Sequence, residues 1–462
     1  MHPTRWGRST HFAIGVGVLL VIAAVVGASA LLTGAHQTSG DSTALPPTPV
    51  AVLRAGVVPV ADDAPVPTTA GLAGALAAPL ADPNLGVITG RIADAKTGRR
   101  LWAQGDDVPM QPASTNKVLT SAAALLTLDR DAKVTTKVMA ADQRTQPGVV
   151  VLVGGGDPTL SAAPAGQDTW YPGAARISDL AAQVRSTGMK VTTVLVDTSL
   201  FSGPDMAPGW DPTDIDGGDV APIQSVMLDG GRIQPTTVES RRSLTPALDA
   251  GRALAVALGV DRATVAAAPG PATGKQLASV QSAPLIERLR QLMSESDNVM
   301  AESVAREVAG QKQLPRSFAG AVDAVTDSLK SAGVDFKGAT LQDSSGLSVL
   351  DRLTATTLDE VVGAAAGQDQ PRLRPLLDLL PIAGGSGTLS DRFLDPATGR
   401  GAAGWLRAKT GSLTGTNALA GIVTDNAGRV LTFAWLSNNA GPTGRTSLDA
   451  LASTVRTCGC DS

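Results

Sequence analysis

An uncharged run from Phe12 to Leu32 constrains where this chain can begin to fold. It is 21 residues long, and a helix that crosses a bilayer needs about 20 residues. Arg5 and Arg8 precede it, which is the charge pattern of an export signal. Ala28-Ser29-Ala30 offers a cleavage pattern, so residues 1–33 are predicted to be a signal peptide or a membrane anchor, and the length favours the anchor. The rest of the chain is expected outside the cytoplasm, in the cell envelope.

A proline-rich stretch separates this segment from the folded part. Residues 34–78 are rich in Pro, Ala and Thr without a sustained hydrophobic period, and they are predicted to form a semi-extended linker. Residues 79–140 and 276–462 are predicted to form one discontinuous domain. Glycine-punctuated strand patterns in residues 141–275 predict a large β-rich insertion within it.

The patterns around the insertion predict an α+β fold. Two alternating runs joined by the turn glycine Gly98 form a hairpin. Three more strand-like runs follow in hairpin order near the C-terminus, ahead of a final helix. Together they predict about five antiparallel strands in one sheet with helices on both sides. The predicted strands are Val87–Asp94, Arg99–Gln104, Trp405–Leu413, Ala418–Thr424 and Val430–Leu436, and the final helix is Ser447–Val455.

The histidines exclude several kinds of active site. All three, His2, His11 and His36, precede the folded part. A Ser-His-Asp triad, a Cys-His pair and a histidine-ligated metal are therefore excluded within it, and a hydrolase would need a lysine or a carboxylate as its base. Cys458 and Cys460 lie at the extreme C-terminus, where a disulfide or free thiols are expected rather than a nucleophile. We predict no metal and no cofactor.

Ser114 and Lys117 lie three residues apart where a loop runs into a predicted helix. One interpretation is a helix N-cap followed by a solvated lysine. The other is a nucleophile with its base, because residues three apart share a helix face and a helix start offers N–H groups to an oxyanion. No other lysine has a serine three residues before it. As a base, Lys117 would need its pKa lowered from about 10.4 by burial and a second nearby cation.

The tripeptide Lys-Thr-Gly occurs twice in the chain. Lys96–Gly98 lies in the hairpin turn, where turn chemistry explains all three residues. Lys409-Thr410-Gly411 lies in an extended run, where glycine often marks close approach of the backbone to a ligand. Lys409 is thus the candidate second cation, and Thr410 offers a hydroxyl to a substrate carboxylate. The N–H of Ser412 and that of the candidate nucleophile would stabilise an oxyanion.

Ser296-Asp297-Asn298 falls between two predicted helices, Pro284–Met293 and Val299–Val308. Alone it is an ordinary polar turn, because Asp and Asn cap helices well. The order of the three motifs is more specific: Ser-x-x-Lys on a helix, then Ser-x-Asn between helices, then Lys-Thr-Gly on a strand. This order is similar to that of the penicillin-recognising serine enzymes.

Four further stretches extend the resemblance, and they are Leu152–Leu160, Ala221–Asp229, Asp343–Ser348 and Leu380–Leu389. Together with the motifs they resemble the D-alanyl-D-alanine carboxypeptidase/endopeptidase family, the class C low-molecular-mass penicillin-binding proteins. The resemblance covers about residues 80 to 455 and implies a serine transpeptidase/β-lactamase-like domain. Two departures are Val220, where that family commonly has glycine, and Asp351, where asparagine is common.

The resemblance implies a role for each motif residue. Ser114 would be the acylated nucleophile and Lys117 its base. Ser296 would relay a proton to the leaving amine, and Asn298 would hold the peptide amide of the substrate. Lys409 would supply positive charge in the pocket, while Thr410, Gly411 and Ser412 would bind substrate. The aspartate of Ser-Asp-Asn would point away as a structural partner.

The partners also follow from the resemblance. It implies hydrolysis of D-Ala-D-Ala ends of peptidoglycan stem peptides, or of an equivalent bond in a cross-link, and acylation by β-lactams. A β-lactamase or esterase of the same fold and a non-catalytic wall-binding protein are the alternatives. If residues 1–33 are not cleaved, the membrane is a further partner. The net charge of -4 and the pI near 5.5 predict no binding of nucleic acid.

Overall fold

The computed structural model describes residues 63–395 and 399–458, which belong to one compact unit. The predicted signal peptide or anchor, residues 1–33, lies outside the described residues. In the described part of the chain, no helix is both long and apolar enough to cross a membrane. Cys458 is disulfide-bonded, and Cys460 lies outside the described residues.

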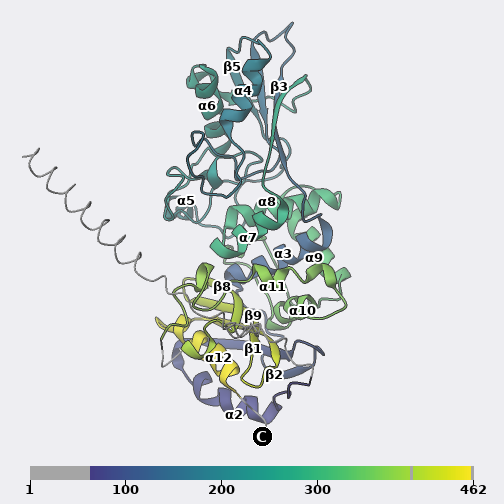
Figure 1. The fold of residues 1–462 in the computed structure, drawn as a ribbon, viewed down its shortest axis with the longest axis vertical. Coiled ribbons are helices and arrows are strands. Elements are labelled where there is room, and N and C mark those ends of the chain that lie inside the picture. Colours follow the sequence, from purple (N-terminus) through teal and green to yellow (C-terminus); the bar gives the residue numbers. More distant parts are fainter. Residues whose placement is uncertain (1–62, 396–398, 459–462) are drawn as a thin grey trace, which may run out of the picture. The chain divides into compact units, whose positions relative to one another are not determined.

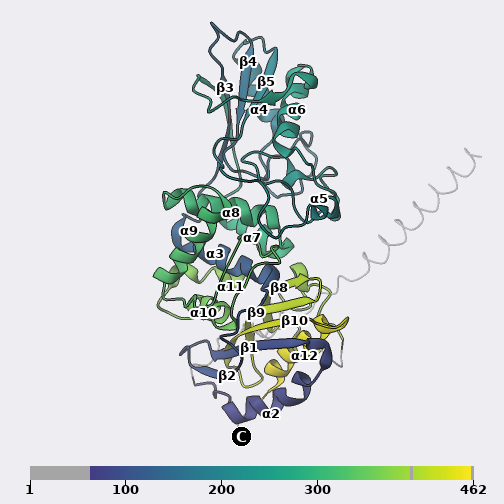
Figure 2. The ribbon, with the colours of Figure 1, turned by 180° about the vertical axis from the view of Figure 1, so that it is seen from behind.

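Five antiparallel strands form the first sheet in the order β2-β1-β10-β9-β8 (Figure 1). The hairpin of β1 and β2 belongs to the same sheet as the C-terminal strands, since every residue of β1 pairs with β10. The two strands lie side by side in Figure 2. This sheet confirms the predicted α+β fold. The strands are β1 Val87–Asp94, β2 Arg100–Gln104, β8 Leu406–Leu413, β9 Thr416–Thr424 and β10 Val430–Asn438.

Alternating residues of the first sheet face two layers of helices, as the strand period requires. Phe433 and Trp435 of β10 pack with α2 and α12. Ala434 and Leu436 face the opposite core, which contains α3 and α10. Helices therefore cover both faces, as predicted. The bounds are α2 Thr69–Leu80, α3 Asn116–Thr127, α10 Ala355–Ala366 and α12 Gly444–Thr457.

Helix α2 corrects part of the predicted linker, residues 34–78, because the linker range runs into this helix. Thr68 caps α2 by accepting a hydrogen bond from the Gly71 N–H at 3.0 Å. Leu72 and Leu76, four residues apart, are completely buried on one helix face. These two leucines anchor the helix, while the composition around them is that of a linker. The apolar pattern was therefore too weak to predict the helix from the sequence.

A second, mixed sheet has the strand order β6-β5-β4-β3-β7. β4 pairs in parallel with β5 and antiparallel with β3, while α4 and α6 pack against the sheet. The predicted limits of the insertion, residues 141 and 275, cut through this sheet, because β3 and β7 lie just outside them and still pair within it. The bounds are β3 Thr135–Ala140, β4 Val149–Val153, β5 Thr193–Asp197, β6 Ala266–Ala267, β7 Gln276–Gln281, α4 Ile177–Ser186 and α6 Pro246–Leu258.

The remaining helices outside the insertion share the apolar core that contains α3 and α10. Of these, α7 and α8 follow directly on one another and hold the Ser-Asp-Asn turn between them, as predicted. The bounds are α7 Leu285–Glu295, α8 Asn298–Gln311, α9 Phe318–Ser331 and α11 Leu376–Leu379, and the insertion adds the short α5, Thr213–Gly217.

Candidate active site

Ser114 lies in a 3-10 turn, Ala113–Thr115, just before α3. Ala113 has a φ of 47°, which costs a non-glycine residue about 1–2 kcal/mol and often marks a functional site. The N-cap of α3 is Thr115, and it makes no side-chain capping bond. Of the two interpretations, the one that makes Ser114 the N-cap of this helix is therefore wrong. Its hydroxyl instead accepts a hydrogen bond from Lys117 Nζ at 2.9 Å.

Lys117 is completely buried and has three hydrogen-bond partners. Nζ lies 2.6 Å from Asn298 Oδ1, 2.8 Å from Ser345 O and 2.9 Å from Ser114 Oγ. The two carbonyl oxygens only accept hydrogen bonds, whereas the hydroxyl also donates. As an ammonium, Lys117 donates to all three groups. As a neutral amine it has two N–H bonds, which match the two carbonyls, and one lone pair, which then faces the Ser114 hydroxyl. The surroundings therefore suit a lysine that accepts the serine proton.

Burial lowers the pKa of Lys117 to about 8. Nearby carboxylates oppose this shift, and Asp343 opposes it most. Of the two predicted causes, burial is confirmed as the largest, whereas repulsion from Lys409 is not among the main causes of the Lys117 shift. The pKa of Lys409 also falls well below its ordinary value, through burial first and then through the charges of Lys117 and Arg392. Repulsion between the two buried lysines disfavours the state in which both are charged.

Lys409 enters the same site from β8 and is completely buried. Its Nζ donates to Ser296 Oγ and to Thr410 O, each at 2.9 Å. The structure thus pairs each buried lysine with a serine: Lys117 with Ser114, and Lys409 with Ser296.

Gly411 brings β8 against the turn that carries Ser114. A Cβ atom on Gly411 would lie 2.6 Å from Pro112 O and 3.1 Å from Ser114 N. The sequence predicted close approach to a ligand, whereas the close neighbour is the backbone around the candidate nucleophile. The absence of a side chain lets the strand and the Ser114 turn meet.

Ser296 and Asn298 belong to the turn between α7 and α8. Ser296 ends α7 with a φ of 58°, and Asp297 starts α8 by accepting the Met300 N–H at 2.9 Å. The Asn298 amide oxygen accepts from the lysine of α3, and its Nδ2 donates to Asp219 O at 3.0 Å. Asn298, predicted to hold a substrate amide, is therefore bonded to the protein at both ends of its side chain.

A cavity of about 740 Å³ lies over these residues. Five predicted site residues line it: Ser114, Ser296, Asn298, Thr410 and Ser412. The two buried lysines lie behind the serines to which they donate. The lining also includes charged side chains of both signs, namely Asp211, Asp214, Asp219, Glu295, Asp391, Arg392 and Arg445.

The loop Asp343–Ser348 completes the site, although the sequence indicated it only as part of the resemblance and assigned it no role in the site. The Asp343 carboxylate accepts three backbone N–H groups of the same loop at 2.6 to 3.1 Å. It also accepts the Trp210 Nε1–H at 2.7 Å. These bonds hold the Ser345 carbonyl against Lys117. An aspartate followed by Ser-Ser-Gly is the composition of a turn in which the side chain bonds its own backbone, and that signal could have indicated the loop.

Thr388 is a second residue that the sequence interpretation missed. Its Oγ1 accepts a hydrogen bond from Thr410 Oγ1 at 2.8 Å, and its side chain lines the cavity. It lies in the stretch Leu380–Leu389, which the sequence indicated only as a resemblance.

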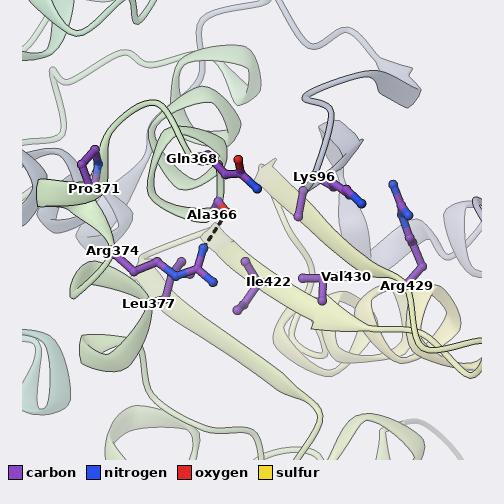
Figure 3. A pocket seen from close by; sticks show the side chains of 11 residues that line it. Lys96, Ala366, Gln368, Pro371, Arg374, Leu377, Ile422, Arg429 and Val430 are labelled. Carbon is purple, nitrogen blue, oxygen red and sulfur yellow. Dashed lines mark hydrogen bonds between the residues drawn. The ribbon is translucent and has the colours of Figure 1, made fainter. Parts of the chain in front are cut away.

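A second cavity, of about 520 Å³, contains none of the predicted site residues in its lining. Figure 3 shows Lys96, Arg374 and Arg429 around it, together with the apolar Ile422 and Val430. The first Lys-Thr-Gly therefore lies beside a different cavity from the second, and no serine lines that cavity.

Two families match the chain. Residues 72–243 and 235–455 match the D-Ala-D-Ala carboxypeptidase 3 (S13) family. Residues 1–59 match the N-terminal domain of the Carboxypeptidase Rv3627c-like proteins.

Two mycobacterial proteins are similar to the chain over its full length. Carboxypeptidase DacB from Mycolicibacterium smegmatis is 70% identical, and Carboxypeptidase Rv3627c from Mycobacterium tuberculosis is 63% identical, with 100% of each chain covered. The D-alanyl-D-alanine carboxypeptidase of an Actinomadura species is 28% identical over 81% of this chain and 82% of that protein.

A solved structure also resembles the fold. The crystal structure of penicillin binding protein 4 (dacB) from Haemophilus influenzae has a TM-score of 0.66 and 23% identity, covering 83% of this chain and 97% of that chain. At this identity the likeness supports the predicted fold alone. The match over residues 72–455 and the full-length relatives confirm the predicted resemblance. The chain belongs to the D-Ala-D-Ala carboxypeptidase 3 (S13) family.

Proposed function

We propose that this chain is a serine-type D-Ala-D-Ala carboxypeptidase that acts on peptidoglycan stem peptides through an acyl-enzyme at Ser114. The observation that carries the proposal is the environment of Lys117. When its amine is neutral, the two N–H groups donate to the two carbonyl partners, and the lone pair then faces Ser114 Oγ at 2.9 Å. The names of the full-length relatives support the same class of reaction.

Acylation begins when Ser114 Oγ adds to the carbonyl carbon of the penultimate D-Ala. The Ser114 proton passes to Lys117 Nζ. The N–H groups of Ser114 and Ser412 hold the oxyanion that forms. The C–N bond then breaks, and the nitrogen of the terminal D-Ala takes a proton from Ser296, which Lys409 replenishes. The proton that Lys117 took from Ser114 replaces the one that Lys409 gave up, so Lys117 is a neutral base again before water adds.

Deacylation uses the same base. Water adds to the ester carbon while its proton passes to Lys117, and the C–O bond to Ser114 then breaks as the serine oxygen regains a proton. The products are the shortened stem peptide, with a new carboxylate, and one D-Ala. The hydroxyl of Thr410 and the charge of Arg445 lie in the cavity lining and bind the terminal carboxylate of the substrate.

The proposal extends to partners and location. β-Lactams acylate Ser114, because their strained amide presents the same carbonyl to the nucleophile. The chain is exported to the cell envelope, where peptidoglycan lies, and the uncharged run at Phe12–Leu32 serves as an anchor or signal peptide.

Intact-mass analysis after benzylpenicillin treatment tests the proposal. Wild-type protein should gain one penicilloyl group at Ser114 and release D-Ala from a pentapeptide that ends in D-Ala-D-Ala. Ser114→Ala should do neither while keeping the wild-type melting temperature. A folded wild-type protein that stays unmodified would refute the proposal.

The same assays separate the alternatives. Rapid loss of the adduct with repeated β-lactam turnover and without D-Ala release would instead assign a β-lactamase. Purified cross-linked muropeptides, offered in parallel, decide between carboxypeptidase and endopeptidase activity.

A further inference from the structure

The insertion contacts the Ser296–Asn298 turn at Asp297, the middle residue of the turn. Asp297 is buried, and one carboxylate oxygen caps α8. The other oxygen, Oδ2, accepts a hydrogen bond of 2.6 Å from the hydroxyl of Tyr171. The tyrosine lies in the insertion, 126 residues before Asp297. The turn that carries two predicted catalytic residues is thus held from outside its own two helices.

Arg232, also from the insertion, completes this contact. Its NH1 lies 3.1 Å from the Tyr171 hydroxyl and 3.9 Å from Asp297 Oδ2, and its guanidinium stacks 4.1 Å above the Trp170 ring. Burial raises the pKa of Asp297, but the charges of Arg232 and Arg242 and the tyrosine hydroxyl together bring it below its ordinary value. Asp297 is therefore a buried carboxylate whose Oδ2 has its partners in the insertion.

A second contact from the insertion orients Asn298. The Asp219 carbonyl accepts from Asn298 Nδ2 at 3.0 Å. Because a carbonyl only accepts, it requires the NH₂ end of the amide to face it, and the amide oxygen then faces Lys117. The neighbouring Gly218 carbonyl accepts from Arg242 Nε at 2.8 Å. Insertion residues therefore determine which end of the Asn298 amide meets the candidate base.

We propose that Tyr171 and Arg232 are positioning residues for acylation: they hold Asp297, so that Asn298 keeps its amide oxygen on Lys117. The proposal rests on the acyl-enzyme proposed above. It assigns the insertion a part in the catalytic centre, in addition to any contact that it makes with the cell wall. Neither positioning residue lines the cavity, so both act through the turn.

The variant Tyr171→Phe tests the tyrosine with little change in volume. It leaves Asp297 Oδ2 without its shortest partner, and the turn relaxes toward other donors. Because small displacements of catalytic groups are costly, the second-order rate of acylation by benzylpenicillin should fall about tenfold. The final stoichiometry should stay at one penicilloyl group per chain. A lost fold would lower the stoichiometry, whereas lost positioning lowers the rate.

Ser328→Ala is the matched control, because it removes a buried hydroxyl that donates to Ala324 O at 2.7 Å within α9, away from the site. It should keep the wild-type acylation rate. If Tyr171→Phe acylates within about twofold of wild type, the positioning proposal is overturned. If wild-type protein itself is not acylated, the proposed function fails instead, so the two failures are distinguishable.

A spectroscopic measurement on the wild-type protein gives a second test that needs no variant. Tyr171 is the only tyrosine in the chain, so protein labelled with ¹³C at the tyrosine ζ carbon gives one NMR line. Acylation changes the protonation state of Lys117 and so the hydrogen bond between Lys117 and Asn298. Because Tyr171 bonds to the neighbouring Asp297, the tyrosine line should shift when benzylpenicillin reacts. A line that stays in place during complete acylation would contradict the proposal.

Discussion

The two Lys-Thr-Gly tripeptides have the same chemical groups in opposite environments. Lys96 is exposed in the turn after β1, and Thr97 donates to Asp94. Lys409 is completely buried in β8, and it donates to Ser296. A Cβ on Gly98 would meet nothing within 4 Å, whereas one on the second glycine would meet Pro112 O at 2.6 Å.

This difference teaches that the tripeptide carries no chemistry of its own. Burial lowers the pKa of Lys409, and the strand places its amine on a serine hydroxyl. In the turn, the same residues close a hairpin. Variants made in pairs, with the same substitution in each tripeptide, test whether the function depends on the environment of the tripeptide or on its three residues alone.

The largest expected effect comes from the two lysines. Lys409→Met removes the donor to Ser296 and should slow acylation by benzylpenicillin by about 10²–10³-fold, as the loss of a positioned donor does in other acyl-transfer sites. Lys96→Met should acylate at the wild-type rate. The measurement is the rate of penicilloyl formation by intact mass. Equal acylation rates for Lys409→Met and Lys96→Met would contradict the conclusion that the two tripeptides differ in function because of where they lie.

The two glycines should give the next largest effect. Gly411→Ala places a methyl group against Pro112 O, and the resulting shift of Ser114 should slow acylation by about 10²-fold. Gly98→Ala should leave the rate unchanged. It should lower the free energy of unfolding by about 1 kcal/mol, because Gly98 has a φ of 69°. Denaturant unfolding and acylation rates measure the two effects, and slower acylation by Gly98→Ala would contradict the comparison.

The pH profile should give the smallest effect. Lys117 with a pKa of about 8 is protonated below that pH and then cannot accept the Ser114 proton. The acylation rate should therefore rise about tenfold between about pH 7 and about pH 9 as the neutral fraction grows. Lys96→Met should follow the same curve. A rate that falls with rising pH would exclude neutral Lys117 as the base.

Much of the fold could be predicted from local patterns. The alternating runs predicted all five strands of the first sheet, and helical periodicity predicted α7 and α8 on either side of the Ser-Asp-Asn turn. α2 was missed because two leucines in an Ala-rich stretch make a weak period. The limits of the insertion were misplaced because the sequence patterns of β3 and β7 predict strands but do not show to which of the two sheets each strand belongs.

The candidate site could be predicted as a set of residues but not as a set of contacts. The motif order selected Ser114, Lys117, Ser296, Asn298 and Lys409. It named burial and a second cation as causes of a lowered Lys117 pKa, but it could not show that burial is the larger one. Their assigned roles remain predictions for the variants above.

The sequence by itself determined the family, the absence of a histidine base in the folded part, and the pairing of a unique Ser-x-x-Lys with the second Lys-Thr-Gly. These features depend on residue identity and short spacings. Only the tertiary structure decided which lysine is buried, which groups accept from it, and that Tyr171 of the insertion reaches Asp297. Burial and hydrogen-bond partners come from segments far apart in the chain, and a pattern of neighbouring residues does not contain them.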